Sequence, residues 1–447
     1  MIDRLFPYQE EGAAFLLERD AALLADAPGL GKTLQVIAAS QYRQDTLYLC
    51  PASLCENVRR EFAKCGREGV VVRGTKGEIP GGGLVIMSYD TVYMDGVFDQ
   101  LDHKWDLLVC DESHLLKSPK AKRSQYVLGN SRRRGLAQRA DKVILLTGTP
   151  VMSHVGELWT ALQALRPDFV DGMSYKNFIY HYCQTREHPQ FGTQVIGHKG
   201  AKVRQLRERL EGDFMLRRLK SDVLPDLPPI RVEPLYISVG VTTSDPLEQA
   251  LLDLAEDGNV SDMVEEQLDP DLYDVEEYVS TIRRETEVMK VREIARIIEA
   301  DLDGGMEKIL VFAHHHETLD ALDDALDRNQ VRLDGQTTPE QRQRAIDQFH
   351  EGDARVFLGQ TQAAGVGLTL HANGKCSDVL FCSLDFTPAN NQQAMMRIHR
   401  IGQPNACLVR YAVASGTYDE RVNHILASKT RRILDVVEEE NEQSPNA

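Results

Sequence analysis

The stretch AALLADAPGLGKTLQVIAAS, from Ala21 to Ser40, decides the fold. It begins with a short apolar run, continues through a loop that contains Gly29 and Gly31, and ends in a segment with helical spacing. The order strand, glycine loop, helix is that of a phosphate-binding loop, where backbone N–H groups and a helix N-terminus face phosphate oxygens. The usual pattern begins with glycine, whereas Asp26 stands in that place here, so a chance match is the alternative.

The residues that end this loop suit the binding of a nucleoside triphosphate. Gly29 and Gly31 permit a tight backbone path, and Asp26 is tolerated at the mouth of the loop if its φ is negative. Lys32 would neutralise the β- and γ-phosphates, and Thr33 would hold Mg²⁺. ATP and Mg²⁺ are therefore the expected ligands of this segment.

Four more apolar runs follow the loop and alternate with helical segments: TLYLCP, GLVIMSYD, WDLLVCDE and KVILLTGTP. Buried strands that alternate with helices predict a parallel sheet covered by helices on both faces. Functional side chains of such a sheet lie at the carboxyl ends of its strands. Pro51, Ser88, Asp111 and Thr147 occupy those positions. From about residue 151 to 227 the pattern becomes mostly helical and irregular.

A second α/β pattern begins near Lys290. Its apolar runs are KILVFAHH, QVRLDG, ARVFLGQ, DVLFCSL and CLVRYAVA. Between the two patterns, residues 245–303 hold 19 acidic and 5 basic side chains. A solvated helical face with a linker is one interpretation of this segment, and an autoinhibitory or partner-binding surface is the other.

Two further motifs carry chemistry that would act on a bound triphosphate. In LLVCDESH an apolar strand ends in Asp111, which would hold Mg²⁺, and Glu112, which would orient or deprotonate the attacking water. A strand-end turn with solvated acids is the alternative. In QQAMMRIHRIGQ, Arg397 and Arg400 are three residues apart and would share one face of a helix as arginine fingers. A solvated basic helix is the alternative for that segment.

Composition excludes several classes of function. The chain has 447 residues, 42% of them hydrophobic, and a net charge of −17, which argues against a general polyanion-binding surface but not against a local basic groove. The eight cysteines form no CxxC pair, which favours a reducing, cytoplasmic compartment. No signal peptide or membrane-spanning run is present. His314 to His316 follow an apolar strand without further ligands at metal-binding spacing, so a strand-end loop is expected there.

Seven motifs in this order resemble the Swi/Snf family of DNA-dependent ATPases, within helicase superfamily two, over nearly the whole chain. They are FPYQEEGAAFLL, DAPGLGKT, DESH, TGTP, FMLRRLKSDVLPDLPP, QAAGVGLTL and QAMMRIHRIGQ. The family's phosphate loop also begins with Asp. DESHLLKSPKAKRS and KILVFAHHHETLDAL are most similar to the distant branch of annealing helicases and fork-remodelling proteins. Gln403, where RNA helicases of the DEAD-box type carry an arginine, and DESH in place of DEAD favour DNA over RNA.

The resemblance implies an α/β fold of two RecA-like lobes with parallel sheets. The expected lobes are residues 1–230, with a helical insertion at about 151–227, and residues 288–435. An acidic helical linker or insertion would cover residues 231–287, and a flexible acidic tail residues 436–447.

The resemblance also implies roles for single residues. Gln9 would read the adenine, with Gly365 and Gln393 as further nucleotide-binding residues. Thr147 and Thr149 would couple hydrolysis to DNA contact. Nucleic acid would run along Pro51, Ser53, Ser88, Thr361 and Gly367 through phosphate contacts, which carry no sequence information.

The expected activity is ATP hydrolysis coupled to sequence-independent translocation on, or remodelling of, double-stranded DNA. Two alternatives remain: a helicase that separates or anneals strands at forked or single-stranded DNA, and an ATP-gated module that binds a protein partner through the acidic segment. Basic clusters suit a DNA groove, although any one of them is also consistent with a solvated face. The clusters are Lys117, Lys120, Lys122 and Arg123; Arg132 to Arg134; and Arg217, Arg218 and Lys220.

The compact chain suggests a bacterial or phage source.

Overall fold

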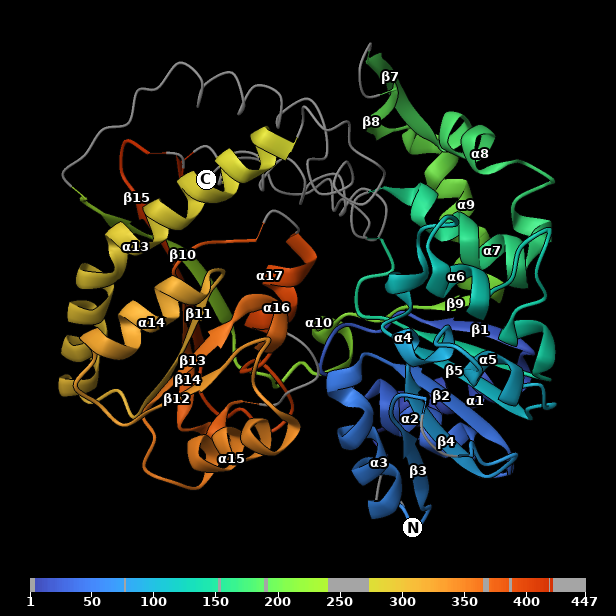
Figure 1. The fold of residues 1–447 in the computed structure, drawn as a ribbon, viewed down its shortest axis with the longest axis horizontal. Helices are drawn as coiled ribbons and strands as arrows, with labels where there is room; N and C mark the ends of the chain where they lie inside the picture. The colour runs from blue at the N-terminus through green and yellow to red at the C-terminus, as the bar shows by residue number, and fades with distance from the viewer. Residues whose placement is uncertain are drawn as a thin grey trace. The chain divides into compact units, whose positions relative to one another are not determined.

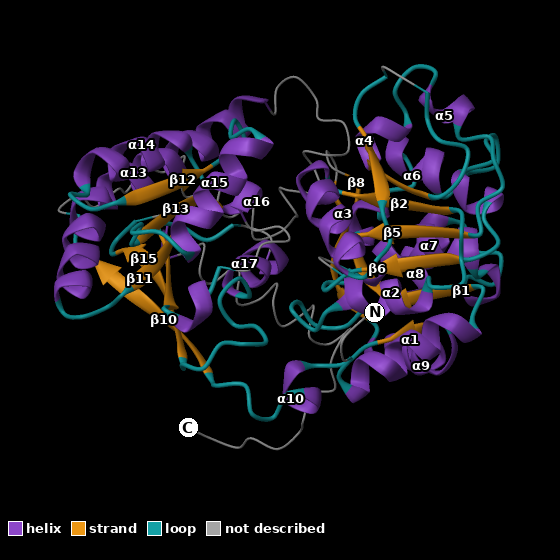
Figure 2. Cartoon of the chain, turned by 90° about the horizontal axis from the view of Figure 1, so that it is seen from below, coloured by secondary structure: helices purple, strands orange, loops and turns teal. Residues whose placement is uncertain are grey.

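The computed structural model describes residues 5–75, 78–151, 154–188, 192–239, 273–364, 370–385, 388–417 and 419–420. Its described residues divide into two compact units, one within residues 1–185 and 197–225, the other within residues 186–196 and 226–431. Each unit has its own sheet flanked by helices (Figures 1 and 2). The two predicted α/β lobes are thereby confirmed as a fold class, while the bounds predicted for them stay a prediction.

A seven-stranded parallel sheet with the order β3-β4-β2-β5-β6-β1-β9 forms the centre of the first unit. Strands β2, β4 and β5 are buried along their whole length, as the continuous apolar runs in the sequence predict. Strands β3 and β9, which are short strands at the two edges, were not predicted from the sequence. The strands are β1 (Ala21–Leu24), β2 (Thr46–Cys50), β3 (Gly69–Val72), β4 (Leu84–Ser88), β5 (Leu107–Asp111), β6 (Val143–Leu146) and β9 (Met215–Leu216).

Helices cover this sheet and continue into the segment that follows β6. The α-helices are α1 (Pro7–Glu18), α2 (Lys32–Ala39), α3 (Cys55–Lys64), α4 (Tyr89–Val92), α5 (Val97–Gln100), α6 (Lys122–Val127), α7 (Trp159–Leu165), α8 (Tyr175–Tyr182), α9 (Gly200–Asp213) and α10 (Lys220–Val223). Single 3-10 turns are η1 (Ala52–Leu54), η2 (Ser113–Leu116), η3 (Leu136–Arg139), η4 (Val155–Leu158) and η5 (Pro167–Phe169).

The expected helical insertion at about 151–227 also contains strands. Besides η4, α7, α8 and α9, it holds the pair β7 (Cys183–His188) and β8 (Gly192–His198), and β9 joins the main sheet beside β1. The description of this segment as mostly helical was therefore incomplete. The sequence of β7, CQTREH, is polar and lacks the alternation that marks a half-buried strand, so only pairing with β8 reveals it.

The second unit is built on a six-stranded parallel sheet with the order β10-β15-β14-β11-β13-β12. Its strands are β10 (Ile230–Ile237), β11 (Lys308–Ala313), β12 (Gln330–Leu333), β13 (Val356–Gln360), β14 (Cys376–Phe381) and β15 (Cys407–Ala414). Its helices are α13 (Tyr273–Asp303), α14 (His316–Ala325), α15 (Pro339–His350), α16 (Thr361–Ala364), η7 (Ala372–Gly374) and α17 (Pro388–Met395).

Strand β10 corrects the prediction that residues 231–287 form a helical linker. It pairs with β15 from Ile230 opposite Cys407 to Ile237 opposite Ala414. Pro234 lies inside this strand and cannot donate a ladder hydrogen bond, which an edge position tolerates. Pairing with a strand about 175 residues later decides the conformation of this segment.

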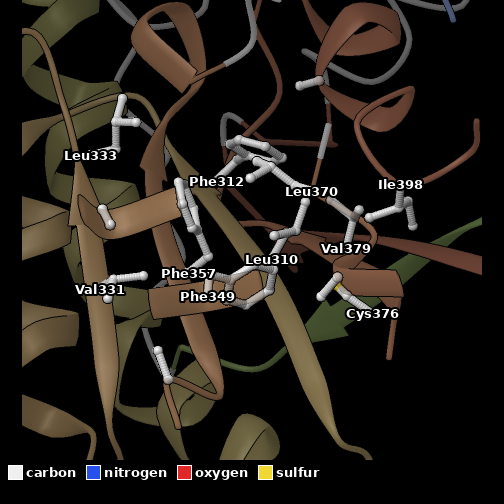
Figure 3. Close-up of a cluster of buried hydrophobic side chains, with 14 of the residues drawn as sticks. Leu310, Phe312, Val331, Leu333, Phe349, Phe357, Leu370, Cys376, Val379 and Ile398 are labelled. Atoms are coloured by element: carbon white, nitrogen blue, oxygen red, sulfur yellow. The ribbon is translucent and has the colours of Figure 1, made fainter. Parts of the chain in front are cut away.

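Alternating side chains of the second sheet build two separate cores. Along β11, Leu310 and Phe312 belong to one cluster, shown in Figure 3, and Ile309 and Val311 belong to the other. This period of two buries both faces of the sheet, the second of them under α13 and α14. Among the described residues, no helix combines the length and apolar character needed to cross a bilayer.

Candidate active site

The phosphate loop lies between β1 and α2. Gly29 and Gly31 have φ values of 91° and 74°, in the left-handed region that favours glycine. A Cβ atom added at Gly31 would lie 2.4 Å from Nε2 of Gln9, so the Gln9 side chain would have to shift. The loop therefore has the tight backbone path that the sequence predicts.

Asp26 anchors the start of the loop, which explains an aspartate where the usual pattern has glycine. Its side chain is fully buried. Oδ1 accepts a hydrogen bond from Nε of Arg218 (3.0 Å), and Oδ2 accepts from Nη2 of Arg218 (2.6 Å) and Nε2 of Gln35 (3.0 Å). The backbone oxygen of Asp26 accepts from Nζ of Lys32 at 2.8 Å. One residue thus holds both the loop and its lysine.

The DNA-groove interpretation of the cluster Arg217, Arg218 and Lys220 is wrong for Arg218. Its side chain is only 11% exposed and is engaged with Asp26, and Nη1 of Arg217 donates to the backbone oxygen of Ala25 at 3.0 Å. The sequence could not reveal this, because the partner carboxylate lies 192 residues away.

Gln9 lies against the phosphate loop rather than in solvent. Its Nε2 donates to the backbone oxygen of Leu30 at 3.1 Å, and its Oε1 accepts from the backbone N–H of Phe6 at 3.1 Å. The hydroxyl of Tyr8 donates to the same oxygen of Leu30 at 3.2 Å. Helix α1 and the loop are therefore joined, while recognition of adenine by Gln9 stays a prediction.

Asp111 and Glu112 stand at the carboxyl end of β5. Asp111 Oδ2 accepts from the hydroxyl of Tyr48 at 2.9 Å, and Oδ1 accepts from the backbone N–H of Glu112 at 2.9 Å. The hydroxyl of Tyr89 donates to the backbone oxygen of Asp111 at 2.7 Å. Glu112 has a φ of 52°, an uncommon conformation for a non-glycine residue that turns the chain sharply after the strand.

The electrostatics at Asp111 suit a divalent cation. Burial, and then the negative charge of Glu112, raises the pKa of Asp111 to about 7. A bound cation would offset both effects, because it favours the charged carboxylate. Thr33 lies in the first turn of α2, directly after Lys32, whose positive charge acts on Asp111 in the same sense as a cation. These residues fit Mg²⁺, although the assignment of Thr33 and Asp111 as its ligands stays a prediction.

A mostly buried histidine lies between the acidic pair and the TGTP motif. His114 Nδ1 lies 3.1 Å from Oγ1 of Thr147 and 3.4 Å from Oε2 of Glu112. Burial lowers the pKa of His114 to about 4, so the imidazole is neutral at physiological pH. Oγ1 of Thr147 also accepts from the backbone N–H of Thr149 at 3.1 Å. Nδ1 of His114 thus lies near both Glu112 and Thr147, and no local pattern in the sequence points to this histidine.

Gly148, in the same motif, brings the end of β6 against the phosphate loop. A Cβ atom at this position would lie 2.7 Å from Cγ of Pro28 and 3.4 Å from Nζ of Lys32. The loop, the acidic strand end and the TGTP motif are thereby gathered at the carboxyl edge of the first sheet, as expected for an open parallel sheet.

The candidate nucleic-acid residues of the first unit differ in exposure. Ser53 is exposed and Pro51 half-buried, both at the turn after β2. Ser88 is buried, and its Oγ accepts from the backbone N–H of Thr91 at 3.2 Å as the N-cap of α4. Thr147 and Thr149 are buried as well. Contact of all five residues with nucleic acid stays a prediction.

Arg397 and Arg400 do not share one face of a helix, in contrast to the prediction. Helix α17 ends at Met395, and both arginines lie in the turns that follow. Nε of Arg397 donates to the backbone oxygen of Gln393 (2.8 Å), and Nε of Arg400 to that of Met396 (2.9 Å). Carbonyls at a helix end have no intrahelical partner, and here the arginine side chains bind them. Their role as arginine fingers stays a prediction, as does nucleotide binding by Gln393.

The remaining predicted residues of the second unit are only partly described. Oγ1 of Thr361 donates to the backbone oxygen of Ala313 at 3.2 Å, at the carboxyl edge of the second sheet. Gly365 and Gly367 lie outside the described residues, as do residues 240–272 of the acidic segment and the predicted tail at 436–447.

The other basic clusters combine structural and exposed side chains. Nε of Arg123 donates to the backbone oxygen of Leu115 at 2.7 Å, and Lys117 pairs with Glu157 at 3.4 Å. Lys120, Lys122 and the run from Arg132 to Arg134 are exposed. The exposed members remain candidates for phosphate contact.

His314 and His315 lie in the loop after β11, as the sequence predicts, whereas His316 begins α14. The backbone N–H groups of His314 and His315 donate to the buried carboxylate of Glu287 at 3.0 and 3.1 Å. Nδ1 of His315 lies 2.9 Å from the same carboxylate. Within the described ranges, no group of three potential metal ligands is found here or elsewhere.

Several residues of the site carry no local signal in the sequence. Tyr48 and Tyr89 lie in or next to apolar runs and are typical of core side chains. Gln35 and His114 are single polar residues within or beside predicted elements. Only the partner that each one meets in the fold identifies its role.

Comparison with known proteins finds two family models that match this chain. Residues 8–241 match the SNF2-related domain, and residues 289–402 match the helicase conserved C-terminal domain. A Caenorhabditis elegans homologue of SWI/SNF-related matrix-associated actin-dependent regulator of chromatin subfamily A-like protein 1 is 31% identical over 96% of this chain and 61% of its own length. The mouse DNA annealing helicase and endonuclease ZRANB3 is 29% identical over 96% of this chain and 40% of its own length.

A solved structure of the Sulfolobus solfataricus SWI2/SNF2 ATPase core in complex with dsDNA is 21% identical, with a TM-score of 0.43 over 97% of each chain. The chain spans less than two thirds of the length of each of the two curated relatives named above. Both of these relatives are animal proteins, so the expected bacterial or phage source finds no support among them. Because the SNF2-related model covers more than half of the sequence, the chain belongs to the SNF2-related family.

Proposed function

We propose that this protein hydrolyses ATP and couples hydrolysis to sequence-independent translocation on, or remodelling of, double-stranded DNA. One observation carries the proposal: the phosphate loop with Lys32, the pair Asp111–Glu112 and the TGTP motif meet at one edge of a parallel sheet. Membership of the SNF2-related family supports the same activity.

The residues of this edge suit direct attack of water on the γ-phosphate. Lys32 neutralises phosphate charge, and Glu112 orients the attacking water or accepts its proton. Thr33 and Asp111 would hold Mg²⁺, which when bound supplies further charge neutralisation on the phosphates. The hydrogen bond between His114 and Thr147 would report the state of Glu112 to the DNA-contacting segment. Arg397 and Arg400 are proposed as arginine fingers for the same reaction.

The proposed DNA contacts use hydroxyls and backbone groups near Pro51, Ser53, Ser88, Thr149 and Thr361, with exposed basic side chains beside them. Such groups bind phosphates and leave base edges unread, so sequence preference is not expected. Binding should weaken as salt rises, because phosphate contacts release counterions.

A second candidate function is strand annealing or remodelling at forks. It is favoured by the similarity to a protein that carries the name DNA annealing helicase. This chain matches only 40% of that relative's length. The annealing activity of the whole relative therefore does not follow for this chain from the shared segment alone.

A protein partner bound through the acidic segment stays a prediction, because residues 245–272 of that segment lie outside the described residues. Such a partner would remain bound after DNase treatment. A cytoplasmic location likewise stays a prediction from the cysteine pattern.

The first experiment is the ATP hydrolysis rate without nucleic acid and with blunt duplex, single-stranded DNA, forked DNA or RNA at fixed salt. Strong stimulation by plain duplex is expected and supports the translocase. Stimulation by forks alone would favour the annealing function instead. ATP binding without stimulation by any of these would contradict a DNA-driven motor.

A further inference from the structure

We propose that Arg218 and Asp26 are positioning residues that clamp the phosphate loop to the helix carrying Gln9, and so set both ATP affinity and selectivity for adenine. The inference rests on the proposed function, since it concerns how the same site holds its nucleotide. We refer to this pair as the Arg218–Asp26 clamp.

The guanidinium of Arg218 holds three elements at once. It donates to both carboxylate oxygens of Asp26, at 3.0 and 2.6 Å, and to Oε1 of Gln35 in α2 at 2.9 Å. Its Nη1 donates to the backbone oxygen of Tyr8 in α1, and its Cζ lies 5.3 Å from the centre of the Tyr8 ring. The loop, α2 and α1 therefore share one planar cation from the segment that follows β9.

Contacts with Arg218 and with helix α1 fix both ends of the phosphate loop. At the start, Asp26 binds Arg218 through its carboxylate and Lys32 through its backbone oxygen. At the end, the backbone oxygen of Leu30 accepts from the Tyr8 hydroxyl (3.2 Å) and from Nε2 of Gln9 (3.1 Å). A shift of Arg218 would thus act on the lysine that faces the phosphates and on the helix expected to face the base.

Gly12 of α1 is an independent indication that α1 lies close to the side chains of Gln35 and Arg218. Glycine inside a helix is unfavourable relative to alanine. A Cβ atom at this position would lie 1.7 Å from Oε1 of Gln35 and 2.7 Å from Nη2 of Arg218. The glycine therefore lets α1 approach the two side chains that complete the clamp.

The contacts require arginine and not just a positive charge. Only a guanidinium presents a rigid fork that binds both oxygens of a carboxylate and leaves further N–H groups for other acceptors. A lysine at 218 would keep the charge but lose the simultaneous contacts with Asp26, Gln35 and Tyr8. This distinction allows the clamp to be tested without introducing an unpaired buried acid.

The test compares Arg218→Lys, Asp26→Asn and Gly12→Ala with the wild-type protein. The matched control is Arg166→Lys, because Arg166 also forms a bidentate pair, with Asp168 on the surface of the same unit. For each protein, kcat and KM are measured with ATP and with GTP at saturating duplex DNA, together with the thermal midpoint.

For the three clamp variants we expect KM for ATP to rise by roughly tenfold or more, with a smaller fall in kcat, because ground-state binding is lost first. The ratio of kcat/KM for ATP over GTP should fall in parallel, and the control should match wild type. An unchanged KM and an unchanged ATP/GTP ratio, with only kcat and the thermal midpoint lowered, would overturn the clamp and leave a purely structural pair.

Two measures keep the test decisive. If a single charged-pair variant fails to fold, the double variant Asp26→Asn/Arg218→Met removes both charges and is expected to show the same change in KM and selectivity. If the wild-type protein hydrolyses no ATP, the proposed function fails, and equilibrium binding of a non-hydrolysable ATP analogue and its GTP counterpart then tests the clamp separately. Unchanged binding of both analogues by the variants would overturn it.

Discussion

Asp111 is a carboxylate that the fold keeps in an unfavourable environment for its charge. It lies at the end of a fully buried strand, next to Glu112, and its pKa is raised to about 7 from the usual 3.8. The folded protein thus holds the proton of Asp111 more tightly than the unfolded chain does. The fold therefore loses stability progressively as the pH rises from about 4 to about 7, and the full cost is present above about pH 7. This is the expected state of a cation site before the cation binds.

Asp111→Asn should therefore stabilise the protein in the absence of Mg²⁺ while it abolishes hydrolysis. The gain should be near zero below about pH 4, grow between about pH 4 and pH 7, and reach on the order of a few kcal/mol at pH 8. Thermal unfolding of both proteins across this pH range measures it. Addition of Mg²⁺ should stabilise the wild type and narrow the gap. A gap that is constant with pH would contradict the charge explanation.

Lys32→Ala and Glu112→Gln should each reduce ATP hydrolysis by about a thousandfold or more, because they remove phosphate neutralisation and the orientation of water. Glu112→Gln should still bind ATP, since the amide keeps the shape of the carboxylate. Hydrolysis and binding of labelled ATP are measured side by side. Normal turnover in either variant would refute the assignment of the site.

At the level of single elements, helix α13 fixes the carboxyl edge of the second sheet. Arg283, Glu287 and Lys290 are spaced four and three residues apart, so they share one face, and all three are buried. Nη2 of Arg283 donates to the backbone oxygen of Leu384 at 2.6 Å. Nζ of Lys290 donates to that of Ala412 at 3.1 Å and pairs with Asp419 at 2.5 Å.

Glu287 receives the largest share of these contacts from the loops after β11 and β14. Its oxygens accept from the backbone N–H groups of His314 and His315, from Oγ1 of Thr318 at 2.9 Å and from the hydroxyl of Ser383. Burial opposes its charge, but hydrogen bonds from His315 and Ser383 prevail and hold the pKa of Glu287 well below its usual range. Its stabilising contribution is therefore present above about pH 4.5 and lost only in strong acid.

Glu287→Gln should destabilise the protein by about 1–3 kcal/mol at pH 7, because buried donors lose a charged acceptor. The thermal midpoint should fall by several degrees. Glu285→Gln is the control, since Glu285 is exposed on the same helix. The difference between wild type and Glu287→Gln should shrink below pH 4. Equal midpoints at pH 7 would contradict the role of Glu287 as the acceptor that joins these loops.

Over the whole molecule, charge is strongly negative, at −17, while exposed basic side chains cluster on the first unit. A polyanion is then expected to bind locally through these clusters and to be repelled elsewhere. The clusters that stay exposed, at Lys120, Lys122 and Arg132 to Arg134, are the candidates for such binding.

Lys120→Gln and Arg132→Gln should each weaken activation by duplex DNA about equally for all sequences. Each should also reduce the slope of log affinity against log salt by about 1. Activation constants measured between low and moderate salt give this slope. Lys104→Gln is the control, because Lys104 is exposed but pairs with Asp141 at 2.8 Å outside the clusters. An unchanged slope in both variants would remove these residues from the DNA contact.

The sequence by itself determined the features that depend on neighbouring residues. Apolar runs ending in turn residues predicted most strands of both sheets. The spacing of Gly29, Gly31 and Lys32 predicted the phosphate loop, and a strand that ends in Asp111 and Glu112 predicted the acidic pair. These patterns are local, because one strand or one loop contains all the side chains that define it.

Only the tertiary structure decided the features that depend on distant partners. The carboxylate of Asp26 meets Arg218 across 192 positions, β10 becomes a strand through pairing with β15, and Tyr48 reaches Asp111 from a neighbouring strand. Arg397, expected on a helix, turns back to bind the end of α17. Local conformational propensity is weak compared with the free-energy cost of burying a polar group without a partner. Such residues therefore take the conformation in which their polar groups are paired.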